Sequence, residues 1–159
     1  MTDSEIKRIK ADGAYKALCL ALDNLNYTYD RTDNMGVIFG LRCDRCSLKF
    51  FVFIDEPRQL VRFLTPLPFD INKEKFIDAA LGIQYINHNL TAGNFDLNID
   101  DGSIYFRVAN SFRGDTCFTS GFFEKMIMLV ASTVDYYVLN IAALNNGSIT
   151  LEEFANHVS

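Results

Sequence analysis

The sequence predicts an α+β fold, in which an antiparallel sheet packs against helices in the order α-ββββ-α-ββ-α-α. Apolar residues recur at helical spacing in residues 12–25, 70–90 and 119–146. Short turns divide the stretch between the first two helices into a four-stranded meander, and an alternating hairpin follows the second helix. At 159 residues, the chain fits a single domain over residues 1–159.

The first helix is predicted from about Asp12 to Leu25. Its basic neighbour, Lys7-Arg8-Ile9-Lys10, belongs to an N-terminal segment that we expect to be frayed. The apolar stripe of the helix consists of Tyr15, Leu18, Leu22 and Leu25.

The meander is predicted between Tyr27 and Leu64, with turns at residues 32–36, 43–46 and 55–58. The run Leu48–Ile54 is apolar at nearly every position, which indicates a central strand covered on both faces. Pro66 and Pro68 end the meander, because proline has no N–H for the ladder.

The second helix is predicted to begin at a cap formed by Asp70 or Asn72 and to run to about Asn89. Helical spacing selects its inward residues, which are Phe76, Ala80, Ile83, Ile86 and Leu90.

The hairpin shows strict alternation on both sides of Asp101-Gly102, a pair that favours a tight primed turn. One face should be polar, with Arg107 across from an acid of the facing strand, and the other apolar. The apolar residues are Phe95, Leu97, Ile99, Ile104, Phe106 and Val108.

The third helix is predicted from Thr119 or Ser120 to a stop at Gly147. Thr150 and Glu153 then form a capping box for a short helix that ends near His157. The inward residues of the third helix are Phe123, Met126, Ile127, Val130, Val134, Tyr137, Val138 and Ile141.

Composition excludes several classes of function. The formal net charge of −5 and the pI of about 4.9 argue against nucleic-acid binding. The most hydrophobic stretch, Met126–Val134, is far shorter than the about 20 residues of a membrane span. The N-terminus begins with acidic residues and shows no secretory signal. The four cysteines form no disulfide framework, so a cytoplasmic location is predicted.

Cys43 and Cys46 form a Cys-x-x-Cys pair, which can be half of a zinc site or a redox pair. Structural zinc needs four ligands, and Cys117, His88 and His157 lie in unlike elements. We interpret the pair as two thiols in a hairpin turn, with metal binding or redox sensing as the alternatives.

Two acidic segments imitate calcium loops without meeting the ligand pattern. A loop ending at Glu153 would need ligands from Ala142 and Leu144, whose side chains have no oxygen. The acids of residues 96–100 should instead line a solvated strand face. No nucleophile motif accompanies the two histidines, so we predict no enzyme activity, no metal and no cofactor.

Three segments resemble the YbjN-type family of bacterial sensory-transduction regulators, which is similar in fold to the class I type III secretion chaperones. The segments are Ala79–Asn87, Gly93–Leu97 and Asp100–Tyr105. The resemblance implies a small acidic protein without catalytic residues that associates with other proteins. Such chaperones form homodimers through the second helix and neighbouring strands, which by analogy assigns the dimer contact to Phe76, Ile83, Ile86 and Leu90.

We therefore predict a non-catalytic protein-binding module, chaperone-like or regulatory, in the bacterial cytoplasm. Its partner is another protein, and its expected state is a homodimer with an exposed apolar patch. The alternative is a small-molecule-binding sensor domain with an apolar cavity between the sheet and the third helix. In that case Tyr136 or Tyr137 would point into the cavity.

Overall fold

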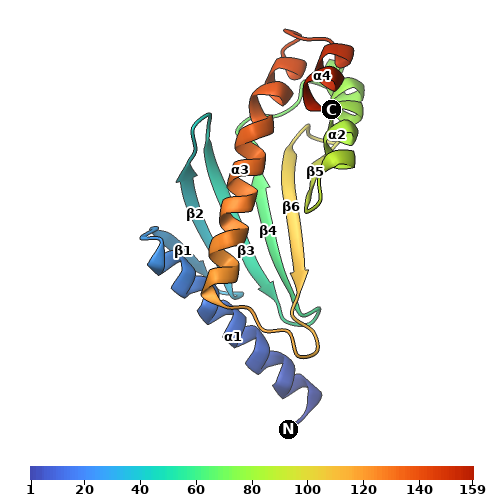
Figure 1. Cartoon of the computed structure of the whole chain (residues 1–159). Coiled ribbons are helices and arrows are strands. Elements are labelled where there is room, and N and C mark those ends of the chain that lie inside the picture. Colours follow the sequence, from blue (N-terminus) through green and yellow to red (C-terminus); the bar gives the residue numbers. More distant parts are fainter.

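The computed structural model describes the whole chain, Met1–Ser159, and its centre is a six-stranded antiparallel sheet (Figure 1). The strands are β1 (Tyr29–Thr32), β2 (Gly36–Arg42), β3 (Ser47–Asp55), β4 (Leu60–Pro66), β5 (Asn94–Leu97) and β6 (Ile104–Ser111). Their order across the sheet is β1-β2-β3-β4-β6-β5. The predicted α+β class and element order are confirmed.

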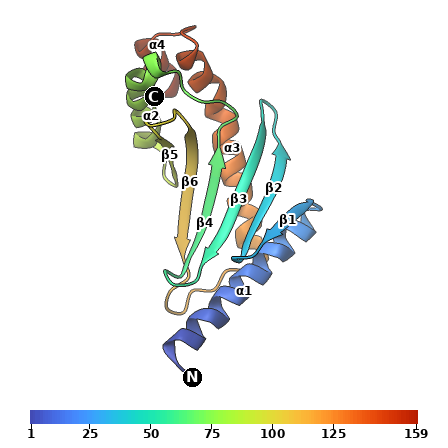
Figure 2. The same cartoon turned by 180° about the vertical axis from the view of Figure 1, so that it is seen from behind.

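Four helices accompany the sheet, and they cover only one of its faces. The helices are α1 (Asp3–Asn24), α2 (Phe76–Asn89), α3 (Ser120–Asn145) and α4 (Leu151–Val158), with a short 3₁₀ turn η1 (Lys73–Lys75) before α2. The helices α1 and α3 lie across one face, while α2 and α4 pack together at one end (Figure 1). The apolar core lies between the sheet and these helices. No helix lies over the opposite face of the central strands (Figure 2).

Helix α1 begins at Asp3, so the prediction of a start near Asp12 was wrong. A capping box explains the early start. The Thr2 hydroxyl accepts a hydrogen bond from the Glu5 N–H, and the Glu5 carboxylate accepts one from the Thr2 N–H. Lys7 also pairs with Asp3 at 2.7 Å, which places the basic cluster within the helix.

The central strand β3 is covered on one face only, so the prediction of cover on both faces was wrong. Its alternate residues, Leu48 to Ile54, are buried towards the helices. On the opposite face, Phe51 and Phe53 are half-buried and Lys49 is exposed. A strand that is apolar on both faces therefore leaves aromatic surface uncovered in this chain.

Helix α2 buries a face that differs by one position from the prediction, because Ala79 is buried and Ala80 is exposed. The side chain of Asn72 does not cap the helix. Instead, the Asn72 N–H donates to Oδ1 of Asn145 at 2.8 Å, which ties the start of this segment to the end of α3.

The hairpin connection is longer than predicted. Strand β5 ends at Leu97, and Ile99 is 69% exposed outside the sheet. Gly102 has a φ of +80°, where a Cβ atom would also overlap the carbonyl oxygen of Ile71. The connection from 98 to 103 is therefore shaped by contact with the segment before α2 as well as by its own turn. The alternation of apolar and polar faces on β6 is confirmed.

Helices α3 and α4 have the predicted caps. Thr119 caps α3, Gly147 follows it with a φ of +77°, and Thr150 and Glu153 form the capping box of α4. By length and composition alone, α3 is long and apolar enough to cross a membrane, with a mean hydropathy of 1.6 over 18 residues. Core helices pass the same test, and the inward face of α3 packs on the sheet.

Candidate functional site

The sheet face without helices carries a row of apolar and polar side chains that runs across five strands. In the strand register, Ile38 is opposite Phe51, Phe51 is opposite Leu64, Leu64 is opposite Arg107, and Arg107 is opposite Asn94. None of these side chains is fully buried. We call this surface the open face, and its residues are Ile38, Lys49, Phe51, Phe53, Asp55, Arg62, Leu64, Asn94, Asp96, Arg107 and Ala109.

Cationic side chains lie over the aromatic rings of the open face. The Lys49 ammonium is 5.3 Å from the centre of the Phe51 ring, and the Arg62 guanidinium is 4.9 Å from that of Phe53. Such contacts are attractive, and the aliphatic stems shield part of the ring surface. On the open face, the apolar rings of Phe51 and Phe53 therefore lie beneath the charged groups of Lys49 and Arg62, which reach solvent.

Arg62 makes only a long ion pair with a carboxylate. Its nearest carboxylate, Asp55, lies 3.8 Å away and makes a closer pair with Arg58 at 2.9 Å. Burial acts to raise the pKa of Asp55, but hydrogen bonds from Arg58 and the charges of Arg58 and Arg62 outweigh it and lower the pKa. Asp55 therefore stays ionised, and Arg62 keeps a side chain that is 41% exposed.

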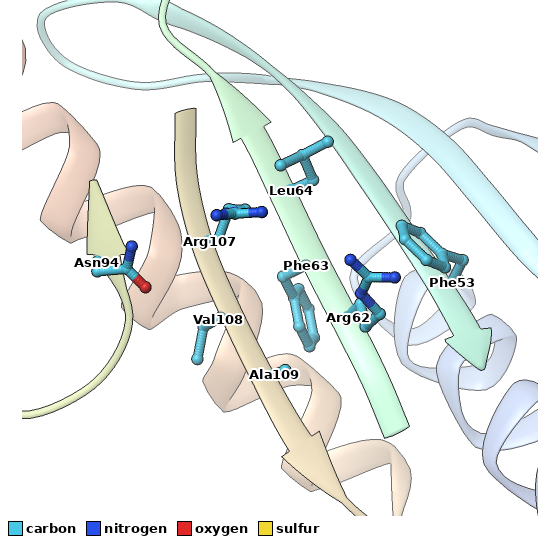
Figure 3. Close-up of a pocket in the computed structure, with 8 residues that line it drawn as sticks. All are labelled: Phe53, Arg62, Phe63, Leu64, Asn94, Arg107, Val108 and Ala109. Atoms are coloured by element: carbon cyan, nitrogen blue, oxygen red, sulfur yellow. The ribbon is translucent and has the colours of Figure 1, made fainter. Parts of the chain in front are cut away.

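A hollow of about 280 Å³ opens on this face where β4 and β6 meet the start of β5 (Figure 3). The guanidinium groups of Arg62 and Arg107 both border it. Its apolar and amide lining comes from Phe53, Phe63, Leu64, Asn94, Val108 and Ala109.

Arg107 also borders a second hollow, of about 450 Å³, on the side of β5. There it pairs with Asp96, so the predicted ion pair with an acid of the facing strand is confirmed, but diagonally, because Asn94 is directly opposite Arg107. The acids of residues 96–100 thus include a partner for an arginine, as expected of a solvated strand face.

No group of three or more His, Cys, Asp or Glu side chains with metal-binding geometry occurs in the chain.

Cys43 and Cys46 flank the β2–β3 turn, as predicted, and the Cys43 N–H donates to the Cys46 carbonyl at 2.8 Å. The Sγ atom of Cys46 lies 3.8 Å from Oδ1 of Asp135 in α3. Burial, followed by the charges of Cys43 and Asp135, raises the pKa of Cys46 to about 11, and burial also raises the pKa of Cys43. A reactive thiol has the opposite shift.

The remaining candidates are dispersed. His88 is exposed on α2 and His157 is exposed on α4, while Cys117 lies in the loop before α3. The segment that imitates a calcium loop forms the end of α3 and the cap of α4, where Glu153 accepts a hydrogen bond from the Thr150 N–H.

The residues assigned to a dimer contact by analogy lie mainly in the core. Ile83 and Ile86 are buried, and Phe76 and Leu90 are half-buried. The outer face of α2 instead exposes a row at helical spacing, formed by Ile77, Leu81 and Tyr85. Leu81 and Tyr85 also border a hollow of about 570 Å³ between α2 and α4.

The alternative function required a cavity between the sheet and α3. Aromatic side chains fill this space, and the ring centres of Phe63 and Phe123 are 6.3 Å apart. Tyr136 is 58% exposed, while Tyr137 packs edge-on against Phe95. None of the five principal hollows lies between the sheet and α3.

Sequence reasoning missed the open face, although its signal was present. In β3, Lys49, Phe51 and Phe53 share one parity, and Arg62 follows at the matching parity in β4. A lysine and an arginine within apolar strands indicate a face that reaches solvent. The prediction that this strand is covered on both faces gave more weight to the length of the apolar run Leu48–Ile54 than to these two charged residues.

The fold and this surface define a class of protein: an α+β domain with helices on one sheet face and an uncovered face with apolar and charged side chains on the other. The chain belongs to the YbjN family, because residues 15–142 match the family, described as “Putative bacterial sensory transduction regulator”. The family is thus described as regulatory, and not as enzymatic. The sequence-based resemblance to this family is confirmed.

A crystal structure of YbjN from E. coli, described as “a putative transcription regulator”, is similar in fold, with a TM-score of 0.61. The match covers 80% of this chain and 90% of that chain at 12% sequence identity. An identity this low shows the fold alone. No functionally curated protein matches the chain. The similarity to type III secretion chaperones stays a prediction.

Proposed function

We propose that this chain is a non-catalytic regulatory domain of the bacterial cytoplasm that binds another protein through its open face. The observation that carries the proposal is the row Ile38, Phe51 and Leu64, which stays half-exposed in the centre of the sheet with arginines beside it. A solvent-facing sheet in an antiparallel fold is ordinarily polar. Apolar side chains that converge on one uncovered surface are typical of a binding site.

The charge of this surface also supports a specific partner. The chain has a net charge of −5, yet Lys49, Arg62 and Arg107 gather on the open face, where Asp55 and Asp96 offset part of the arginine charge. Opposite charges across an interface steer association and exclude wrong partners. We therefore expect the partner to be acidic where it meets the sheet.

The test compares capture of bacterial cytoplasmic proteins by the tagged chain and by two variants, with quantitative mass spectrometry. Leu64→Glu places an acid in the open face, and Leu139→Glu is the control, because Leu139 is 55% exposed on the outer face of α3. We expect one protein to be captured in fixed ratio by the wild type and by Leu139→Glu, and to be lost with Leu64→Glu.

Circular dichroism establishes that both variants fold. Equal capture of the same proteins by both variants would exclude the open face as the binding site. Capture of no protein, together with a rise in melting temperature in a metabolite screen, would favour the sensor alternative.

The proposal includes self-association through the outer face of α2. The row Ile77, Leu81 and Tyr85 is exposed, and it belongs to α2, which packs with α4 at one end of the molecule (Figures 1 and 2). The homodimer expected from the family resemblance would then use these residues in place of the buried Ile83 and Ile86.

A further inference from the structure

Strand β6 continues well beyond the end of its neighbour β5. Residues 94–97 of β5 pair with residues 104–107 of β6, while β6 pairs with β4 as far as Ser111. Figures 1 and 3 show the last half of β6 running on with no strand on its outer side. An unpaired edge therefore lies at residues 108–111.

The direction of the backbone groups on this segment follows from two hydrogen bonds. The Leu67 N–H donates to the Ile104 carbonyl at 2.9 Å, and the Phe112 N–H donates to the Gln59 carbonyl at 3.0 Å. Even-numbered residues of β6 thus face β4. Because neighbouring residues of a strand alternate in direction, Ala109 and Ser111 point their N–H and C=O groups outward. Both residues are exposed.

The two arginines of the open face flank this unpaired segment. Arg62 of β4 is opposite Ala109 of β6. Arg107 lies two residues before Ala109 in β6, so both side chains are on the same face. Ala109 has only a methyl group, so the hollow of about 280 Å³ lies between the two guanidinium groups. A side chain from an added strand would enter this hollow between the two arginines, where Arg107 also pairs with Asp96 and Arg62 lies 3.8 Å from Asp55.

We infer that the partner adds an extended acidic segment as a strand to β6, in line with β5. The inference rests on the proposed function and specifies its binding mode and the chemistry of its partner. Backbone groups of the added segment bond to Ala109 and Ser111. An Asp or Glu side chain of that segment lies between Arg62 and Arg107 and accepts charge-assisted hydrogen bonds.

Charge argues against a second copy of the chain at this edge. Antiparallel pairing of two β6 edges would form one continuous sheet with the open faces of both copies on the same side. Each copy would bring Asp55 and Asp96 already engaged with its own Arg62 and Arg107, so a second copy would offer these arginines no additional acid at the edge.

The experiment selects peptides from a random twelve-residue display library on the immobilised full chain. We expect the recovered peptides to be rich in Asp and Glu, and we measure their binding by fluorescence anisotropy. Ala109→Pro removes the outward N–H, and an edge strand tolerates proline where the N–H faces solvent. It should weaken binding by about tenfold, as should Arg107→Glu. The control Ala109→Ser keeps the N–H and should stay within about twofold.

Amide hydrogen exchange of the wild type supplies a readout that needs no variant. Binding of a selected peptide should slow exchange at Ala109 and Ser111, because their N–H groups gain partners. Exchange at Arg31, on the other edge of the sheet, should not change. Unchanged exchange at Ala109 and Ser111 would overturn strand addition.

The remaining outcomes separate this inference from the proposed function. Peptides that bind Ala109→Pro and Ala109→Ser equally, but not Leu64→Glu, overturn strand addition and leave the open face as the binding site. Peptides that also bind Leu64→Glu normally contradict both.

Three further results would contradict the inference that an acidic segment binds this edge. The first is recovery of basic peptides or of none, and the second is displacement of the selected peptides by millimolar inorganic phosphate. The third is self-association of the chain that Ala109→Pro abolishes in sedimentation experiments. Phosphate displacement would indicate a site for a free anion, and the loss of self-association would indicate a second copy of the chain.

Discussion

Asp135 is a charged residue in the middle of an apolar helix, and its environment explains why it is tolerated there. It is 8% exposed, and its carboxylate accepts a hydrogen bond from the Arg45 N–H at 2.8 Å. The Arg45 guanidinium lies 3.5 Å away, and Cys46 is a further neighbour. A buried charge needs such partners. Asp135 therefore fixes the β2–β3 turn, including Cys46, against α3.

The same contact predicts the reactivity of Cys46. With a pKa of about 11, about one Cys46 in a thousand is a thiolate at pH 8. We expect iodoacetamide to modify the exposed Cys117 first, and Cys46 to react faster as the pH rises towards 11. Asp135→Asn removes a negative charge, so the pKa of Cys46 should fall and its alkylation at pH 8 should accelerate. Mass spectrometry of the labelled peptides gives the rates.

Asp44→Asn is the matched control for this prediction. Asp44 lies in the same turn, and its charge acts on Cys43, not on Cys46. Equal acceleration of Cys46 by both substitutions would show that loosening of the turn, and not the charge of Asp135, controls the thiol.

At the scale of elements, the contact between α2 and α4 involves a helix that lies outside the segment matching the family. The match ends at residue 142, before α4 begins. Phe154 of α4 is fully buried against α2, at the position of Gly82. A Cβ atom at Gly82 would lie 2.8 Å from Cδ2 of Leu144 and 3.0 Å from Cε1 of Phe154. Gly82 is thus required for the close approach of these helices.

A double-mutant cycle tests this packing. Phe154→Ala should lower the free energy of unfolding by about 3 kcal/mol, because it leaves a cavity. Gly82→Ala alone should lower it by about 1 kcal/mol, since overpacking exceeds the gain in helix propensity. In the Phe154→Ala background, the same change should cost less, because only the contact with Leu144 remains and its side chain can move into the vacated space. Urea denaturation measures all four proteins, and equal effects of Gly82→Ala in both backgrounds would contradict the contact.

At the scale of the whole molecule, the helices on one face leave two separate surfaces for other molecules. One is the open face with the β6 edge, and the other is the outer row of α2. A regulatory domain that self-associates needs both surfaces to be free at the same time. Their separation allows a dimer in which each open face still reaches a partner.

The proposed dimer can be tested by measuring the mass of the protein in solution. Light scattering coupled to gel filtration should give the mass of a homodimer for the wild type. Leu81→Glu should give a folded monomer with an unchanged circular dichroism spectrum, because Leu81 is 49% exposed in the single chain. Leu139→Glu, on α3, should stay dimeric. A wild type that is monomeric at all concentrations would exclude the α2 contact.

Local patterns determined most elements of this fold. The alternation of β6, the cap at Thr119 and the capping box at Thr150 and Glu153 act over a few residues, so the sequence alone predicted them. The length of α1 could also have been predicted, since its cap at Thr2 and Glu5 is equally local. Tertiary contact overrode the pattern at Gly102, where the backbone of Ile71 shapes the connection.

The position of each element relative to the others was decided only by the tertiary structure. No local signal places β6 next to β4 with β5 at the edge, or puts α1 and α3 on the same face. These arrangements depend on burial summed over the whole chain. They leave Phe51, Leu64 and Arg107 uncovered and the edge at Ala109 unpaired. The sequence by itself thus determined the class of fold and its segments, while long-range packing decided which surfaces remain exposed.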